Sequence, residues 1–325
     1  MIMPIPSLAS RLGLPSALAA LIFGAAAPAE ADTAASAPFA PMTLTHDLGE
    51  TVLEHRPERV AALGMNDLDF LDSLGVPVAG IPKDFVPHFL SAYADDPQIR
   101  DLGFIVKPNI EQIYALQPDL VLMSPLQAEH YREISSFAPV LYFDVDYRNS
   151  ATGHLDAVKD HFLTLGKIFG KEEAAREGVA ALDRQVARLR DEIADRPEKA
   201  LILLYNNGAF RSFGQRSRYG FVFSDLGVTP AGEASETELH GRPVTSEFIE
   251  AADPDILFII DRTAVMEHRP VLTRDQIANP LLESTPAWAN DRVIFVDPEA
   301  WYVTAAGPTS LSIIIDELRE GYRRR

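Results

Sequence analysis

The sequence predicts an α/β protein made of two lobes joined by one long, rigid helix, with a ligand cleft between the lobes. Three observations predict it: short buried strands alternate with helical patterns, one segment recurs in both halves, and an unbroken amphipathic stretch separates the halves. Strands that alternate with helices form a parallel or mixed sheet covered on both faces, so each lobe is expected to be Rossmann-like. A cleft between two such lobes is a natural small-molecule site.

The amphipathic stretch covers residues 171–196. Its apolar positions recur at alternating steps of four and three and form one stripe on a helix: Ala175, Val179, Leu182, Val186, Leu189 and Ile193. Pro197 ends the pattern, because proline disfavours the α conformation of the residue before it. A coiled-coil segment or an ordinary surface helix is the alternative. About three heptads is short for a coiled coil, so we favour a strut between two lobes.

The recurring segment pairs a helix with a Pro-Asp turn and a strand. Glu111-x-Ile-x-Ala-x-x-Pro-Asp-Leu120 matches Glu247-x-Ile-x-Ala-x-x-Pro-Asp-Ile256 at one offset. Leu74-Gly-Val76 likewise recurs as Leu226-Gly-Val228. Such junctions occur in many α/β proteins, but several matches in the same order favour two related lobes.

The other elements follow from the same patterns. The N-terminal lobe covers residues 43–170. In it we expect a hairpin within 42–60 and strands at 59–64, 76–81, 120–123 and 140–143. We also expect helices at 66–74 and 127–136, the first with Asn66 as its N-cap. In the C-terminal lobe, residues 197–325, we expect strands at 200–205, 256–260 and 293–296, and helices at 219–226, 245–251, 276–283 and 309–318.

The chain starts with a targeting segment. Arg11 precedes LGLPSALAALIFGAAA, an apolar run of signal-peptide length that is short for a membrane span. Ala29-Glu-Ala31 gives the small-x-small cleavage pattern, so residues 1–31 are a predicted signal peptide and 32–42 a flexible leader. An uncleaved anchor helix is the alternative. No other apolar run is long enough to cross a bilayer, so we expect a periplasmic protein that is not membrane-embedded.

Composition excludes several classes of function. The 325 residues carry a net charge of -18, which argues against nucleic acid as a partner, because phosphate binding needs a basic face. There is no cysteine, hence no disulfide, thiolate metal site, lipid-anchored cysteine or cysteine nucleophile. The chain also lacks a nucleophile elbow, a Walker A loop, H-E-x-x-H and G-x-G-x-x-G after a strand. His154 and His161, near Lys159 and Asp160, are assigned to a solvated helix face.

Four polar elements of the second half indicate a binding site. They are Arg216-Ser-Arg218-Tyr219-Gly220, Asp261-Arg262, Asp297-Pro-Glu-Ala-Trp301-Tyr302 and Glu238-Leu-His240-Gly241. Two of them follow predicted strands, where ligands of open α/β sheets bind. Two arginines at element ends suggest an anionic ligand, although a single arginine is more often a surface ion-pair partner. Tyrosine and histidine are also suitable ligands for ferric iron.

At these residues the sequence resembles the periplasmic substrate-binding proteins of ferric-siderophore ABC importers, in the branch that binds catecholate and petrobactin-like siderophores. The resemblance runs from about Arg59 to Leu318. The motifs that carry it are Asp69-Phe-Leu-Asp-Ser-Leu-Gly-Val, Ile81-Pro-Lys, Lys107-Pro-x-x-Glu111, Leu163-x-Leu-Gly-Lys-Ile-Phe-Gly-Lys171, Ser217-Arg-Tyr-Gly-Phe221, His240-Gly241, Ile260-Asp-Arg262 and Asp297-Pro-Glu-x-Trp-Tyr302.

The resemblance implies two lobes bridged by a rigid helix, with the ligand in a shallow cleft. Arg218 and Arg262 would face the anionic oxygens, and His240 and Tyr302 would complete iron coordination where the siderophore leaves positions open. Tyr219 and Trp301 complete the expected ligand-binding set. One exposed glutamate per lobe, Glu111 and Glu247, would dock onto the permease; the alternative is a first-turn glutamate that stabilises the helix dipole. The family's Ser-Gly-Arg-Gln stretch is here Ser-Pro-Leu126-Gln, so a cleft arginine is replaced by leucine.

The resemblance therefore implies a monomeric carrier without catalysis. Its partners would be a ferric siderophore and the permease subunits of an ABC importer. No intrinsic cofactor is expected, since Fe(III) would arrive within the siderophore complex. A haem or cobalamin carrier of the same fold is an alternative, for which Tyr302 and His240 could serve haem. A secreted hydrolase that processes chelates is another, and the absence of a nucleophile–base motif weighs against it.

Overall fold

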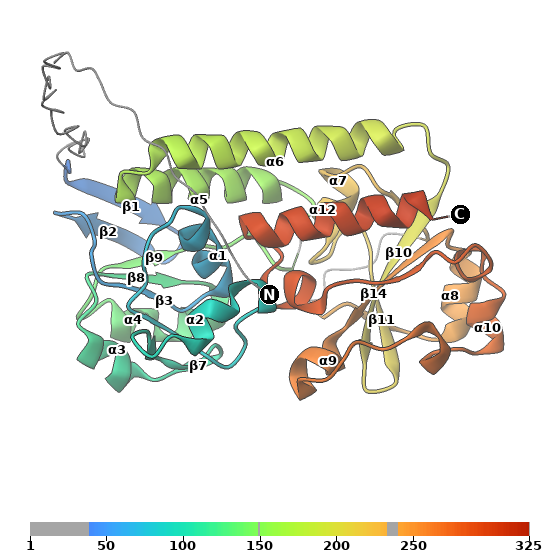
Figure 1. Ribbon diagram of the computed structural model, residues 1–325, viewed down its shortest axis with the longest axis horizontal. Helices are drawn as coiled ribbons and strands as arrows, with labels where there is room; N and C mark the ends of the chain where they lie inside the picture. Colours follow the sequence, from blue (N-terminus) through green and yellow to red (C-terminus); the bar gives the residue numbers. More distant parts are fainter. Residues whose placement is uncertain (1–38, 149, 233–239, 325) are drawn as a thin grey trace, which may run out of the picture. The chain divides into compact units, whose positions relative to one another are not determined.

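The computed structural model describes residues 39–148, 150–232 and 240–324, which belong to one compact unit. The predicted signal peptide and most of the predicted leader, and also Glu238 and Leu239, lie outside the described residues. Two separate sheets define two lobes (Figure 1). None of the described helices has the length and apolar character needed to cross a bilayer.

The first lobe is built on a parallel sheet with the strand order β5-β4-β3-β8-β9. A hairpin, β1 and β2, precedes it. The elements are β1 (Met42–His46), β2 (Gly49–Leu53), β3 (Val60–Ala62), α1 (Met65–Ser73), β4 (Gly80–Ile81), η1 (His88–Leu90), α2 (Ser91–Asp95), β5 (Arg100–Asp101), β6 (Gly103–Phe104), β7 (Lys107–Pro108), α3 (Ile110–Leu116), β8 (Leu120–Met123), η2 (Pro125–His130), α4 (Tyr131–Ile134), β9 (Val140–Tyr142) and α5 (His154–Phe169).

The second lobe has a mixed sheet with the order β13-β11-β10-β14-β15, and β12 also pairs with β10. Its elements are β10 (Lys199–Asn206), β11 (Ala209–Phe213), α7 (Gly220–Ser224), β12 (Thr229–Pro230), β13 (Arg242–Val244), α8 (Ser246–Ala252), β14 (Ile256–Asp261), α9 (Arg262–Glu267), η3 (Arg274–Gln276), α10 (Pro280–Glu283), α11 (Pro286–Ala289), β15 (Val293–Phe295), the π-helix η4 (Glu299–Thr304) and α12 (Pro308–Arg323). The predicted two-lobe α/β fold is confirmed. Within this lobe the sequence missed β11, β12, β13, α9, α11 and η4.

The recurring segment has the same local structure in both lobes. The helices α3 and α8 are capped by the side chains of Asn109 and Thr245, and each ends in a left-handed residue. Asp119 accepts hydrogen bonds from the backbone where β3 begins, and Asp255 does the same where β10 begins. The Pro-Asp turn therefore ties one strand to its parallel neighbour in each lobe.

Two helices run from one lobe to the other. The predicted strut is α6 (Glu172–Ile193), and its apolar stripe packs against α5 and α12. α12 begins on the first lobe, where Asp69 of α1 accepts hydrogen bonds from the backbone N–H groups of Thr309 (3.1 Å) and Ser310 (3.0 Å). A Cβ at Gly307 would overlap that carboxylate, so the approach requires glycine. α12 ends beside the second sheet, where Phe258 of β14 meets its Gly321.

Three local expectations were wrong. The N-cap of α1 is Gly64, not Asn66, whose side chain accepts a hydrogen bond from Ala306 N instead. The strand expected at 76–81 is only Gly80–Ile81. His154 and His161 are buried rather than solvated: His154 stacks on Phe221, and His161 Nε2 lies 2.9 Å from Asp67 Oδ1.

Candidate functional site

Three neighbouring strands of the second sheet deliver one residue each to a common point. β10 ends at Asn206, Arg262 follows β14, and Tyr302 lies on the π-helix after β15. Arg262 donates from Nε to the phenolic oxygen of Tyr302 (2.7 Å) and from Nη1 to Asn206 Oδ1 (2.9 Å). The site thus lies at the carboxyl ends of the parallel strands, where open α/β sheets bind ligands.

Arg218 reaches the same point from the loop before α7. It donates from Nη2 to the backbone carbonyl of Tyr302 (2.5 Å). Its guanidinium lies over the rings of Tyr147, Tyr302 and Tyr219, at 5.0, 5.3 and 5.7 Å from their centres. Cation–π contacts of this kind stabilise a cation that is withdrawn from water. Arg218 is only 8% exposed, so it forms the floor of the site, whereas Arg262 is half-buried and more accessible.

Neither of these two arginines has a carboxylate partner among the described residues. Other partly buried arginines do: Arg269 pairs with Asp261, and Arg319 pairs with Glu192. The Nε group of Arg218 is buried without a hydrogen-bond partner in the described part of the chain. In a protein of net charge -18, two unneutralised guanidinium groups at one point form a local anion site.

His240 and Tyr302 lie side by side, with ring centres 6.5 Å apart. Although His240 is exposed, desolvation by the surrounding protein is the main cause that lowers its pKa, and the nearby charges of Arg218, Arg262 and Arg211 lower it further. The neutral form of the imidazole is therefore favoured. This is the form that can bind a metal, because one ring nitrogen then has a free lone pair. The sequence-predicted pair is thus brought together, and the iron-ligand role stays a prediction.

Tyr219 and Trp301 were expected to line the site, but both side chains are fully buried. The Tyr219 hydroxyl donates to the Trp301 carbonyl (2.9 Å), and the Trp301 indole donates to Glu317 Oε2 (2.6 Å). We expected Tyr219 and Trp301 to contact the ligand, but their side chains are buried and support the backbone next to Tyr302 instead.

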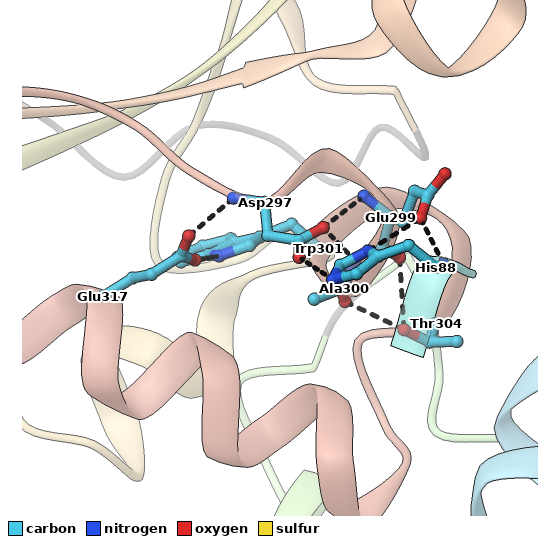
Figure 2. Close-up of polar contacts among 7 residues, drawn as sticks. All are labelled: His88, Asp297, Glu299, Ala300, Trp301, Thr304 and Glu317. Carbon is cyan, nitrogen blue, oxygen red and sulfur yellow. Dashed lines mark hydrogen bonds and ion pairs between the residues drawn. The ribbon is translucent and has the colours of Figure 1, made fainter. Parts of the chain in front are cut away.

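Glu317 of α12 anchors the start of the Tyr302 segment (Figure 2). Its second oxygen accepts a hydrogen bond from Asp297 N at 2.6 Å. Burial raises the pKa of Glu317 to about 7, although both hydrogen bonds oppose the shift. Figure 2 also shows Asp297 and Glu299 on either side of His88, which comes from the first lobe.

Sequence reasoning missed Tyr147 and Asn206. Tyr147 lies on the first lobe; its hydroxyl accepts a hydrogen bond from Asn66, and burial raises its pKa to about 12. It thereby presents a neutral ring to Arg218. Tyr147 lies in an irregular loop where no periodicity marks it. Asn206 could have been found, because it ends a strand beside the one that leads to Arg262.

At the end of β8 the first lobe contributes an apolar rather than a cationic group. Leu126 follows β8 and is 44% exposed. The neighbouring Gln127 is fully buried and donates to the carbonyls of Leu63 and Ile105, which holds the turn in place. The predicted replacement of a cleft arginine therefore leaves an exposed leucine at the carboxyl edge of the sheet.

Glu111 and Glu247 occupy matching places on the surface. Each is exposed and lies in the first turn of its helix, two residues after the capping residue. The Glu247 pKa is lowered, first by its own backbone N–H and then by the Thr245 side chain. Both the docking role and the simple helix-dipole role fit this placement, so docking stays a prediction.

Neither of two cavities in the described residues includes the arginine cluster. One of about 630 Å³ is bounded by His88 of the first lobe and by residues of α9 and of the loop that leads to the Tyr302 segment. Another of about 760 Å³ lies against α6 and the start of α12, and no predicted ligand residue lines it. The polar cluster, rather than either cavity, is therefore the candidate site.

Comparisons with known proteins agree with this architecture. A model of the periplasmic binding protein family matches residues 60–300. The ferric-anguibactin-binding protein FatB of Vibrio anguillarum is 56% identical over 283 residues, which are 87% of this chain and 88% of FatB. The petrobactin-binding protein YclQ of Bacillus subtilis is 32% identical over 288 residues, covering 87% and 89%. The solved structure of the siderophore-binding protein BauB, bound to two acinetobactin molecules and ferric iron, is 55% identical, with a TM-score of 0.84 over 87% of this chain and 99% of BauB.

Proposed function

Because this chain belongs to the periplasmic binding protein family, we propose that it captures a ferric siderophore and delivers it to an ABC-type importer. The named relatives bind ferric anguibactin, petrobactin and ferric acinetobactin. The observation that carries the proposal is the pair Arg218 and Arg262, which converge on Tyr302 without an acidic partner in the described residues. The signal-peptide pattern supports a periplasmic location, and the proposal includes no reaction.

Electrostatics support an anionic iron chelate as the ligand. A ferric tris-catecholate carries about three negative charges, and one arginine at about 4 Å contributes roughly 4 kcal/mol of attraction at an effective dielectric of about 20, before desolvation. The planar guanidinium of Arg262 can also stack on a catechol ring. Ligand approach elsewhere is opposed by the acidic remainder of the protein.

His240 and Tyr302 are proposed to complete the coordination of iron when the siderophore leaves positions open. Support comes from their proximity and from the lowered pKa of His240, which keeps a lone pair available. Tyr302 would then share its oxygen between iron and Arg262.

Delivery is proposed to use Glu111 and Glu247 as one contact per lobe. Their support is the matched exposed placement on α3 and α8. Charge reversal of both to lysine should abolish stimulation of the importer's ATPase in proteoliposomes while siderophore binding is unchanged. Unaltered stimulation would remove this part of the proposal.

Binding itself is tested by fluorescence. The ferric complexes of 2,3-dihydroxybenzoate and of acinetobactin should quench the tryptophan emission saturably, and iron-free ligands should quench less. Arg262→Ala should weaken binding about 10- to 100-fold, as expected for a lost charge-assisted contact. The exposed Arg132 of α4 offers the control, Arg132→Ala. A folded protein that binds no ferric chelate would exclude the proposed function.

A further inference from the structure

The segment that carries Tyr302 is held by the first lobe at both ends. Near its end, Ala306 N donates to Asn66 Oδ1 (3.2 Å), and Asp69 caps the helix that follows. Near its start, Asp297 and Glu299 meet His88, which begins η1 of the first lobe. The geometry of Tyr302 therefore depends on contacts that cross between the lobes.

His88 makes three contacts with this segment (Figure 2). Its backbone N–H donates to Glu299 Oε2 at 2.6 Å, and its ring Nδ1 lies 2.9 Å from the same oxygen. Its Nε2 lies 3.4 Å from Asp297 Oδ2. The other oxygen of Asp297 accepts the N–H groups of Glu299 (2.9 Å) and Ala300 (3.1 Å), so this carboxylate also fixes the first turn of the π-helix.

The ring of His88 bridges two acidic side chains of the segment. Both ring nitrogens face carboxylate oxygens, Nδ1 that of Glu299 and Nε2 that of Asp297. No lysine or arginine in the described residues forms an ion pair with Asp297 or Glu299. The other charged or titratable groups nearby are His268 and Arg269, which line the same cavity, and Glu317 behind Asp297.

We propose that His88 is a positioning residue for the binding site. Its backbone N–H and its ring hold Asp297 and Glu299 together from the first lobe, and this fixes the π-helix on which Tyr302 meets Arg262 and Arg218. The effect on ligand binding rests on the proposed function, whereas the effect on the segment does not.

The first test needs no ligand. Backbone amide NMR of the full mature chain compares the wild type with His88→Ala and with His55→Ala, which removes an exposed histidine of the same lobe. The amides of residues 297–302 should shift and exchange faster with solvent in His88→Ala. In His55→Ala they should match the wild type.

Two results of this test would overturn the inference. One is a segment whose amide signals and exchange rates are unchanged in His88→Ala. The other is a His88 signal that responds to chelator treatment of the isolated protein, because the three donor groups lie within 4.8 Å of one another and a bound divalent cation would then be what holds them. His88→Gln, which keeps one side-chain donor, should hold the segment partly.

The second test measures binding of ferric 2,3-dihydroxybenzoate. The dissociation constant should rise about threefold in His88→Ala, in line with the loss of a partly exposed polar contact. His55→Ala should match the wild type. If wild-type protein binds no chelate, the proposed function fails while the NMR result still decides the role of His88. If binding is unchanged in His88→Ala although the segment shifts, the positioning role is refuted.

Discussion

Arg262 donates to the phenolic oxygen of Tyr302, and Arg218 donates to the backbone carbonyl of the same residue. One tyrosine therefore orders both cationic groups of the site. The π-helix makes this possible, because it places the Tyr302 side chain toward Arg262 while Trp301, its neighbour, is buried against Glu317. A substitution of Tyr302 should therefore change the positions of the two arginines and hence the electrostatic potential of the site, and not only metal coordination.

Tyr302→Phe is the direct test of this arrangement. Removing the hydroxyl leaves Arg262 with Asn206 as its remaining partner, so ferric chelate affinity should fall about tenfold, the value of one charge-assisted hydrogen bond. Where the siderophore leaves positions open, the visible tyrosinate-to-iron absorption should also disappear. The exposed Tyr114 provides the matched control, Tyr114→Phe. An unchanged spectrum would remove Tyr302 from the iron ligands.

Leu126→Arg should change the ligand preference. A third cation at the carboxyl edge of the first sheet adds attraction for a triply charged chelate, so ferric tris-catecholate binding should tighten roughly tenfold with a steeper salt dependence. Leu163→Arg, on the surface of α5, is the control for added charge alone. Equal gains in both variants would mean that Leu126 does not face the ligand.

Glu317→Gln should alter the pH dependence of stability. The folded-state pKa of about 7 lies above the ordinary value of 4.5, so the folded protein binds this proton more tightly. The stability linked to it is complete below pH 4.5 and is lost as the pH rises through about 7. Melting temperatures between pH 5 and 8 should therefore decline less in Glu317→Gln than in wild type. Glu320→Gln, an exposed change on the same helix, should keep the wild-type slope.

His154 should make the protein sensitive to acid. Burial lowers its pKa from 6.5 to about 4, so the unfolded chain takes up a proton that the folded protein refuses. Stability should consequently fall as the pH drops from 6.5 toward 4. In His154→Leu this part of the decline should be absent from denaturant titrations, even if stability at pH 7 is lower. A decline that matches the His55→Leu control would contradict the assignment.

The sequence was sufficient for features that depend on periodicity or repetition. The stripe in residues 171–196 predicted α6, and the Pro-Asp repeat predicted equivalent turns in both lobes. His154 and His161 were misplaced because their sequence neighbours Lys159 and Asp160 were taken to share their face. On the helix they instead align with the buried Val158 and Leu165.

The interior of the site was less accessible to sequence reasoning. Tyr219 and Trp301 follow a loop and a strand end just as Arg218 and Tyr302 do, and only the packing shows that their side chains turn inward. Tyr147 and His88 contact the second lobe from the first, Tyr147 from an irregular loop and His88 from the start of the short helix η1. Contacts of this kind depend on how two sheets meet, which no local pattern records.

The two helices that run between the lobes have a consequence for transport. Arg319 of α12 pairs with Glu192 of α6, and α12 starts on Asp69 of the first lobe, so the lobes are joined by a braced pair rather than a single pivot. Filled and empty molecules would then offer the permease nearly the same outer face. Empty carriers would occupy the importer as competitors, and the rate of uptake would follow the ratio of filled to empty protein rather than the amount of filled protein alone.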